Sequence, residues 1–325
     1  HTPLPVVAAA VERVASTPAV ALTRLYAGYS NEVYDVTTGD GRALMVRIAH
    51  RPEHFLAERW AIERYRAAGI PAPAVLGVSH LTVGGEPLSI CVEQRLPGTP
   101  LSDLAQEWGR DAPQIVELSH EAGRLLATMH RIPVVGYGRL DDSGRGPYPT
   151  WDVFFVDSLT ERAARLDGPP VAALRDIVRE ALDTLEAHRE LLRRQPARLL
   201  HGDFVPVHLL AHVPGIGTAT ERAPIAAGPA HRISGILDLE DCLAGDPAFD
   251  FARWHPEVDA RVGLAPVLAE YAAAAEDIGA DFLLRVRLGQ LRYSVHWALL
   301  TAERGDLPGA ETAAGYVRRE LARSM

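Results

Sequence analysis

The change in hydrophobic pattern near Leu101 constrains the fold of this chain more than any other feature of its sequence. Before it, short apolar runs alternate with turn residues, which is typical of strands in an antiparallel sheet. After it, apolar residues recur at helical spacing over long segments. Strand-like runs lie at 19–28, 31–38, 43–50 and twice within 70–96, and helical segments at 1–16, 52–69, 115–130, 169–192, 264–278, 281–305 and 309–324. We predict an α+β chain: an antiparallel five-stranded sheet with one inserted helix, then a mainly helical part.

The dipeptide Pro97-Gly98 separates these two parts. With 325 residues the chain is long enough for two lobes with separate cores, which we place at 1–96 and 97–325. The second part has two short strand-like runs, 208–213 and 232–239, and the segment between them is rich in Gly, Pro and Ala. We predict a long mobile loop at 213–231. Its Gly-Ile-Gly sequence lacks the flanking strand and helix of a dinucleotide motif and receives no phosphate-binding role.

The charge and apolar content exclude several classes of protein. The formal net charge is −9, whereas nucleic-acid-binding proteins normally have a basic patch. No apolar run approaches the roughly 20 residues of a membrane span. Glu12 and Arg13 interrupt the apolar N-terminal run, as in an amphipathic helix and unlike a signal peptide. Two cysteines, Cys91 and Cys242, rule out a disulfide framework and suit a reducing compartment. We expect a cytoplasmic monomer or homodimer that binds neither nucleic acid nor a membrane.

The sequence contains no lysine, and all 33 residues counted as Lys or Arg are arginine. Schiff-base chemistry and the P-loop motif both need a lysine amine, so the sequence excludes both. A permanently charged cationic side chain in an active site must therefore be an arginine.

Two stretches of the second part concentrate polar side chains between apolar residues: "LLHGDFVPVHLL" at 199–210 and "GILDLEDCLAGDPAFDFA" at 235–252. Asp203 follows an apolar run in a tight glycine turn, and Asp238 ends a strand-like run. Taken alone, each aspartate would be explained by a turn or cap role. A metal-dependent hydrolase is another interpretation of the donor types in this region, which are His201, Asp203, His208 and His212.

Together, the two stretches resemble the aminoglycoside phosphotransferase family. Its catalytic loop is His-Gly-Asp, four further residues and a metal-binding Asn, and its second metal motif is a strand followed by Gly-Asp-Pro. The resemblance covers nearly the whole chain and is closest in pattern to hygromycin B phosphotransferases, through "VRI", "GYGRL", "TWDVF" and "LGQLRYSVHWAL". It implies a bilobal protein-kinase-like fold, with a nucleotide-binding N-lobe and a helical catalytic C-lobe. It also implies ATP or GTP as the co-substrate and Mg²⁺ as the bound metal ion, with Mn²⁺ as the other candidate metal.

The resemblance implies that Asp203 is the base that accepts the proton of the attacking hydroxyl, and that Asp238 is a metal ligand. His208 stands where most members have Asn, and macrolide phosphotransferases also have His there. A neutral imidazole can bind a metal, although it suits Mn or Zn better than Mg. We assign His208 as the second metal ligand, against the alternative of a core histidine bonded to the backbone.

Three further polar residues receive structural roles. We expect His201 to brace the loop by hydrogen bonds and Asp250 to hold the loop from its helix. Asp246 is expected to be a helix cap.

Kinases hold the nucleotide phosphates with a strand lysine that pairs with a helix glutamate. Arg47 of "ALMVRIAH" is expected to replace that lysine, because arginine is permanently charged and can bind phosphate through two nitrogens. Its expected partner is Glu58, and Glu63 is the rival; a solvated strand-end arginine is the alternative. The predicted nucleotide-binding residues are Ser30 and Asn31 over the phosphates, Arg47 and Glu58, and Glu93, Gln94 and Arg95 through backbone groups.

Substrate contacts are expected from acids that bind ammonium groups and aromatic residues that stack on sugar faces. The candidates are Glu240, Asp241, Trp254, His255, Trp151, Tyr293, His296 and Trp297. Ordinary core or surface positions are the alternative for each, above all for aromatic residues at helical spacing.

The sequence therefore predicts a nucleotide-dependent phosphotransferase whose acceptor is a hydroxyl of a small-molecule antibiotic. The resemblance favours an aminoglycoside such as hygromycin B, with a macrolide or a nucleoside antibiotic of the capuramycin kind as further acceptors, and implies resistance or self-protection. The alternatives are a kinase for a sugar, choline or amino alcohol, the metal-dependent hydrolase, and a non-catalytic binding module. Fold alone does not separate the kinases.

Overall fold

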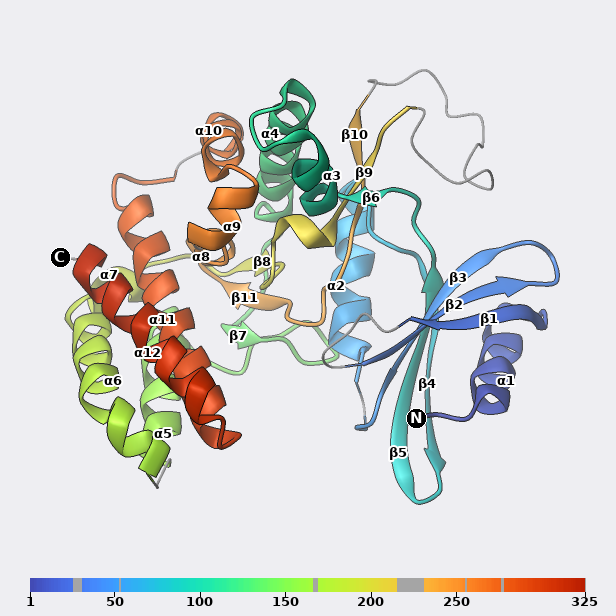
Figure 1. Cartoon of the computed structure of the whole chain (residues 1–325), viewed down its shortest axis with the longest axis horizontal. Helices are drawn as coiled ribbons and strands as arrows, with labels where there is room; N and C mark the ends of the chain where they lie inside the picture. The colour runs from blue at the N-terminus through green and yellow to red at the C-terminus, as the bar shows by residue number, and fades with distance from the viewer. Residues whose placement is uncertain are drawn as a thin grey trace. The chain divides into compact units, whose positions relative to one another are not determined.

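The computed structural model describes residues 1–25, 31–52, 54–165, 169–214, 231–254, 256–275 and 278–324. These residues form two compact units (Figure 1). The first unit is 1–103 with 207–240, and the second is 104–206 with 241–325. The chain therefore passes from the second unit to the first within the stretch that contains His201, Asp203 and His208. A functional boundary at residue 96 stays a prediction.

The first unit is built on an antiparallel five-stranded sheet. In spatial order its strands are β1 (Ala19–Leu25), β2 (Glu32–Thr38), β3 (Ala43–Ala49), β5 (Glu86–Gln94) and β4 (Val75–Val83). Residues alternate between the two faces, so Val46 and Ile48 lie in a core with helix α1 (Leu4–Ala15), whereas Arg47 lies on the other face. Helix α2 (Leu56–Ala67) follows β3 and presents Glu58 to Arg47. The predicted sheet with one inserted helix is confirmed.

A second, three-stranded sheet completes the first unit. It consists of β6 (Thr99–Pro100), β9 (Leu209–His212) and β10 (Arg232–Ile236), with β9 in the middle. A short 3₁₀ turn, η2 (Pro206–His208), leads into β9, and the Leu237 N–H donates to the His208 carbonyl at 2.9 Å. The two predicted short strands are therefore neighbours. Most of the loop expected between them, residues 215–230, lies outside the described residues.

Helices make up most of the second unit (Figure 1). In chain order they are α3 (Leu101–Trp108, which begins in the first unit), α4 (Pro113–Met129), α5 (Ser158–Ala164), α6 (Pro169–Ala187), α7 (Arg189–Arg193), α8 (Ala248–Ala252), α9 (Pro256–Arg261), α10 (Leu264–Ala274), α11 (Phe282–Glu303) and α12 (Leu307–Ser324). Helix α11 is buried on several sides, by α12, α8, α6 and α5, and its apolar residues accordingly surround the helix instead of forming one stripe. The long predicted helices are confirmed, although the segment 169–192 divides into α6 and α7 at His188.

A small sheet in the second unit was not foreseen, because two or three residues give no periodic signal. Strand β11 (Leu243–Gly245) pairs antiparallel with β7 (Gly138–Arg139) and β8 (Arg198–Leu200). A π-helical turn, η1 (Val153–Asp157), was also missed. Strand β8 leads directly into His201, and β11 leads into the Gly-Asp-Pro sequence, so this sheet fixes both motifs of the second unit.

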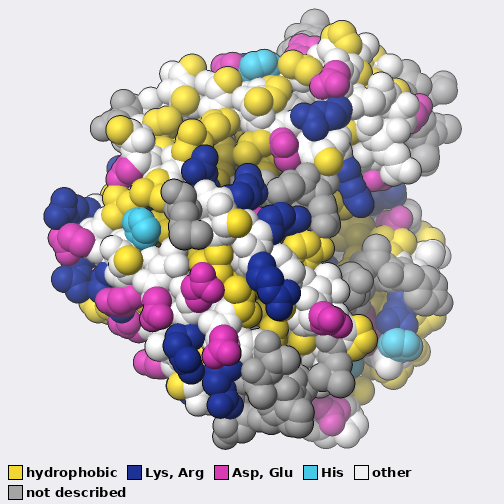
Figure 2. Space-filling model, turned by 60° about the vertical axis from the view of Figure 1, so that its left-hand side comes forward, with side chains coloured by type: hydrophobic (Ala, Val, Ile, Leu, Met, Phe, Trp, Pro, Cys, Tyr) yellow, Lys and Arg dark blue, Asp and Glu magenta, His cyan; other side chains and the backbone are white. Residues whose placement is uncertain are grey.

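Charged side chains of opposite sign lie close together on the helices. In the lower left part of the face drawn in Figure 2, arginine and acidic side chains lie side by side. On the helices of the second unit, Arg165 pairs with Glu161 and Arg194 with Glu190, both at i,i+4 spacing. Exposed pairs of this kind each contribute about 0.3–0.5 kcal/mol. No helix within the described ranges has both the length and the apolar character needed to cross a membrane.

Candidate active site

The His201-Gly202-Asp203 turn requires glycine at its centre. Gly202 has a φ of +84°, in the left-handed region that glycine adopts without strain. A Cβ atom added there would lie 2.1 Å from the carbonyl oxygen of Asp241. The turn therefore depends on the close approach of the segment that precedes β11, and any side chain at 202 would displace the Asp203 backbone.

Asp250 of helix α8 holds this turn through hydrogen bonds to its backbone. Its fully buried carboxylate accepts the N–H groups of His201 at 2.9 Å and Gly202 at 2.7 Å, and it pairs with Nε2 of His130 at 3.0 Å. The other nitrogen of His130 bonds the Tyr271 hydroxyl at 3.0 Å. Burial acts to raise the pKa of Asp250, but the hydrogen bond and charge of His130 hold it below its ordinary value. The predicted bracing role of Asp250 is confirmed.

His201 and Asp246 also have the structural roles that we expected. The ring Nδ1 of His201 accepts the Asp203 N–H at 3.2 Å, and His201 is fully buried. Asp246 accepts the Ala248 N–H at 3.1 Å, as a cap at the start of α8, and in addition forms a buried ion pair with Arg285.

Arg253 makes a direct ion pair with the predicted base. Its Nε and Nη2 atoms lie 2.7 and 2.6 Å from Oδ1 of Asp203. The same guanidinium lies over the ring of Tyr293, 4.0 Å from its centroid. Sequence reasoning missed Arg253; the signal available was its position one residue beyond the end of α8, three residues after Asp250.

His208 and Asp238, the two predicted metal ligands, are neighbours in the first unit. Their Nε2 and Oδ2 atoms are 3.4 Å apart. Asp238 lies just beyond β10 with a φ of +61°, a left-handed conformation that Asp adopts more readily than most residues. Burial raises the pKa of Asp238 to about 6, and the charges of Glu240 and Glu58 act in the same direction.

This pair fits a divalent cation. Mg²⁺ typically takes one or two protein carboxylates and completes its shell with water and phosphate oxygens. Together with burial, the negative charges of neighbouring carboxylates, among them Glu93 and Glu240, raise the pKa values of Glu58 and Asp238. The positive charge of Arg47 lowers them. A bound cation would offset this excess of negative charge. Asp238 and His208 are the residues that would hold it.

Arg47 pairs with two carboxylates. Its Nη2 donates to Glu58 Oε1 at 2.6 Å and to Glu93 Oε2 at 3.2 Å, and its Nε is 3.1 Å from Glu93 Oε1. The Arg47 side chain is only 12% exposed. The rival Glu63 instead bonds the exposed Arg59. The predicted Arg47–Glu58 pair is confirmed, whereas the side-chain role of Glu93 was not foreseen, because it depends on the strand register of β3 and β5.

The remaining predicted nucleotide-binding residues lie in several environments. Asn31 donates to Glu240 Oε2 at 2.5 Å, and Ser30 lies outside the described residues. The backbone N–H groups of Gln94 and Arg95 donate to carbonyls of the first unit, those of Ala74 and Ala43. The Arg95 side chain pairs with Asp35 at 3.2 Å.

The predicted substrate residues do not form one group. Trp151 and Trp254 are 0% and 1% exposed and pack in the core of the second unit: the Trp151 ring lies against Gly245, and Trp254 Nε1 donates to the Phe204 carbonyl. Asp241 pairs with Arg139 at 2.6 Å. His255 lies outside the described residues.

Glu240 belongs to the first unit. Its carboxylate is 3.6 Å from Nε2 of His54 and accepts the Asn31 amide. Hydrogen bonding to His54 lowers the pKa of Glu240 to about 2.

Tyr293 and Trp297 line one pocket, whereas His296 faces an arginine-rich region beside it. His296 Nδ1 lies 2.9 Å from Arg162 Nη1. Arg292, 7% exposed, donates to the Phe155 carbonyl at 3.0 Å and lies over the ring of Phe154. Burial, followed by the charges of Arg292 and Arg162, lowers the pKa of His296 to about 3.

The stability of the protein should therefore depend on pH through His296. Between pH 6.5 and 3 the unfolded histidine binds a proton that the folded one does not, so stability falls as the pH falls below about 6.5. We expect this residue to account for a loss of about 2 kcal/mol between neutral pH and pH 5. Urea unfolding of the wild type and His296→Gln at pH 7.5 and 5.0 measures it. Equal pH dependence in the two proteins would contradict the prediction.

The Arg47 cluster offers a matched pair of variants on one helix. Glu58→Gln removes a buried charge that faces Arg47, and we expect a loss of about 1–3 kcal/mol in the free energy of unfolding. Glu63→Gln alters an exposed pair and should cost less than about 0.5 kcal/mol. Urea unfolding of both variants tests this, and a similar cost for the two would mean that the Arg47–Glu58 pair does not contribute as described.

An antiparallel five-stranded sheet with one inserted helix, followed by a mainly helical unit, is the architecture of a kinase-like phosphotransferase. Among the described residues no group of three or more His, Cys, Asp or Glu side chains is arranged to hold a metal ion. The model of the phosphotransferase enzyme family matches residues 21–284. The chain belongs to this family, and it is a phosphotransferase.

The proteins whose solved structures share this fold are named for different substrates. One is a protein proposed to be a fructosamine-3-kinase from Thermobifida fusca YX-ER1, with 18% identity, a TM-score of 0.64 and coverage of 97% of this chain and 98% of that one. The macrolide 2′-phosphotransferase MphH from Brachybacterium faecium has 15% identity, a TM-score of 0.58 and 97% coverage of both chains. APH(2″)-IIIa, solved with GDP and kanamycin, has 15% identity, a TM-score of 0.65 and coverage of 99% and 100%. At these identities the likeness establishes the fold and leaves the acceptor open.

Proposed function

We propose that the protein transfers the γ-phosphate of ATP or GTP to a hydroxyl group of a small-molecule antibiotic. The observation that supports this most is the Asp203 turn, braced by Asp250, followed five residues later by His208, which pairs with Asp238. A phosphorylated antibiotic has added negative charge and bulk where it must fit its target. The product would therefore be inactive, which gives resistance or self-protection in the cytoplasm.

On this proposal three groups of residues have distinct roles in phosphate transfer. Asp203 accepts the proton of the attacking hydroxyl. A divalent cation, Mg²⁺ or Mn²⁺, would neutralise phosphate charge when bound by Asp238 and His208. Arg47, fixed by Glu58 and Glu93, supplies a positive charge towards the phosphates. On this proposal residues 1–96 bind the nucleotide, and residues 97–325 contain the base and the acceptor site.

The direct test is a panel of acceptors. Hygromycin B, kanamycin, a macrolide and a nucleoside antibiotic are each incubated with the protein, Mg²⁺ and either ATP or GTP. A mass gain of one phosphate on any of them supports the proposal. Nucleotide binding without transfer to any antibiotic would contradict the antibiotic part of it.

A kinase for small metabolites is the second candidate, because one of the structures of this fold is proposed to be a fructosamine-3-kinase. The same assay discriminates the two when a ketosamine, a free sugar and choline join the panel. Phosphorylation of one of these, with no antibiotic modified, would favour the metabolite kinase.

The proposed role of His208 as a metal ligand can be tested separately. His208→Asn replaces an imidazole by an oxygen ligand, which Mg²⁺ prefers. We expect the variant to keep substantial activity and to shift its metal preference towards Mg²⁺, measured as the ratio of rates with Mg²⁺ and Mn²⁺. An unfolded variant would indicate that His208 is structural instead.

A further inference from the structure

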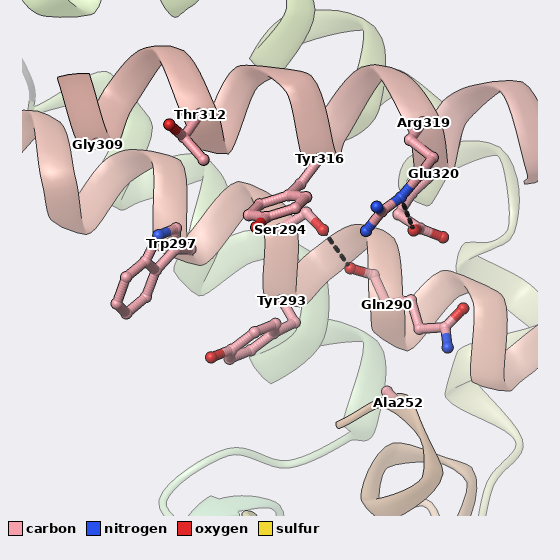
Figure 3. A pocket seen from close by; sticks show the side chains of 10 residues that line it. All are labelled: Ala252, Gln290, Tyr293, Ser294, Trp297, Gly309, Thr312, Tyr316, Arg319 and Glu320. Atoms are coloured by element: carbon pink, nitrogen blue, oxygen red, sulfur yellow. Dashed lines mark hydrogen bonds and ion pairs between the residues drawn. The ribbon is translucent and has the colours of Figure 1, made fainter. Parts of the chain in front are cut away.

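A pocket of about 390 Å³ lies between helices α11 and α12 (Figure 3). Three aromatic rings line it: Tyr293 and Trp297 from α11, and Tyr316 from α12. Tyr293 and Trp297 are four residues apart and therefore lie on the same face of α11. Trp297 is 38% exposed, which is uncommon for so large an apolar side chain and leaves ring surface free for contact. Aromatic side chains of this kind bind flat ring faces.

The pocket and the proposed base, Asp203, belong to the same compact unit. Tyr293 lies 4.0 Å from the guanidinium of Arg253, and Arg253 makes the ion pair with Asp203. Arg253 directly follows Ala252, which is itself part of the pocket lining. The Tyr293 ring of the pocket lining therefore contacts the side chain that pairs with the proposed base.

The pocket offers no uncompensated carboxylate. Glu320 is the one acidic residue in its described lining, it is 1% exposed, and it pairs with Arg319 and Arg323, each at 3.3 Å. A multiply charged ammonium compound needs several carboxylates to replace its hydration. The pocket supplies one, and two guanidinium groups already compensate it.

Cations already lie close to two of the three aromatic rings. Arg253 lies over Tyr293, and Arg319 lies 4.9 Å from the centroid of the Tyr316 ring. On the neighbouring side of α11, Arg292 and Arg162 flank His296. A further positive charge in this pocket would be repelled instead of bound by cation–π interaction.

We propose that this pocket binds the acceptor and that it selects a neutral alcohol with an apolar or aromatic ring face, not a polycationic aminoglycoside. The proposal rests on the proposed phosphotransfer function, whose acceptor class it narrows.

The first experiment compares acceptors graded by charge on the full chain with Mg²⁺ and ATP or GTP. Neutral probes are phenyl β-D-glucoside and uridine; a singly charged probe is phenyl 2-amino-2-deoxy-β-D-glucoside; a polycationic probe is kanamycin. Binding by calorimetry and transfer by mass gain are both recorded. We expect phenyl β-D-glucoside to bind at least about ten-fold more tightly than its amino counterpart, which corresponds to one unfavourable charge contact. Equal or tighter binding of the amino compound or of kanamycin would overturn the proposal.

Variants locate the binding in this pocket. Trp297→Ala and Tyr316→Ala should each weaken binding of the neutral probe about ten-fold and raise KM more than they lower kcat. Trp60→Ala, on α2 in the other unit, should leave binding within about two-fold. Arg319→Gln removes one of the cations beside Glu320 and should improve binding of the amino probe relative to the neutral one by about three-fold. Neutral-probe binding that is unchanged in both Trp297→Ala and Tyr316→Ala would contradict the assignment of the pocket.

The outcomes separate this inference from the function on which it rests. If the protein binds neither ATP nor GTP with Mg²⁺ or Mn²⁺, the phosphotransfer proposal fails, whereas the acceptor-binding data still test the pocket. If nucleotide binds and kanamycin is the best phosphate acceptor, the function holds and the neutral-acceptor inference fails.

Discussion

Replacing Asp203 by Asn is expected to lower kcat by about 10²–10⁴-fold, the usual effect of losing a general base. Asn has nearly the same size and retains a hydrogen-bond acceptor for Arg253, but it cannot take the proton of the attacking hydroxyl. The turn should survive, because Asp250 holds it through backbone groups of His201 and Gly202. The rate of phosphate transfer to the best acceptor of the panel measures the effect, with the nucleotide Kd measured in parallel.

Asp157 provides the matched control for this experiment. It also forms an ion pair with an arginine of the second unit, Arg189, and takes no part in the proposed site. Asp157→Asn should retain the wild-type rate within about two-fold. If Asp203→Asn transferred phosphate as fast as the control, Asp203 would not be the base.

Replacing Asp250 by Ala is expected to produce one of the largest losses of stability available in the chain, about 3–5 kcal/mol in the free energy of unfolding. The substitution leaves the N–H groups of His201 and Gly202 and the ring of His130 buried without their acceptor. A buried donor without a partner keeps its full desolvation cost. Activity should fall with stability, because the same bonds fix the turn that positions Asp203.

Two comparisons make the Asp250 result specific. Asp250→Asn keeps one acceptor oxygen and should cost less than the alanine variant. Asp183→Ala removes an exposed carboxylate from helix α6, which should change stability by no more than about 0.5 kcal/mol. Urea unfolding of all three variants provides the measurement. Equal costs for Asp250→Ala and Asp183→Ala would show that the buried network does not hold the loop.

Much of the fold was predictable because its signals are local. Strands β2 and β3 alternate between buried and more exposed residues, and helices such as α4 and α6 repeat their apolar residues every three or four positions. Among the pieces that escaped prediction, strands β7, β8 and β11 and the π turn η1 are too short to show a period. Their hydrogen bonds are made with segments far away in the sequence, such as β8 with β11.

The candidate site likewise has a part that the sequence predicted and a part that depends on tertiary packing. A short loop pattern predicted Asp203 with its brace Asp250, and the order of strand and helix predicted the Arg47–Glu58 pair. The second carboxylate on Arg47 depends on the register of two strands, and Arg253 reaches Asp203 only because α8 packs beneath the turn. Aromatic residue type suggested substrate contact for Trp151 and Trp254 alike, whereas packing placed both in the core.

By itself, the sequence determined the longer elements, their order and the residues able to accept a proton or bind a metal, because periodicity, turn chemistry and side-chain type are properties of short segments. Only the tertiary structure decided the charge of the pocket beside α11, the low pKa of His296 and the partner of Asp203. These depend on which faces of distant helices meet and on how far burial removes water from the charges between them.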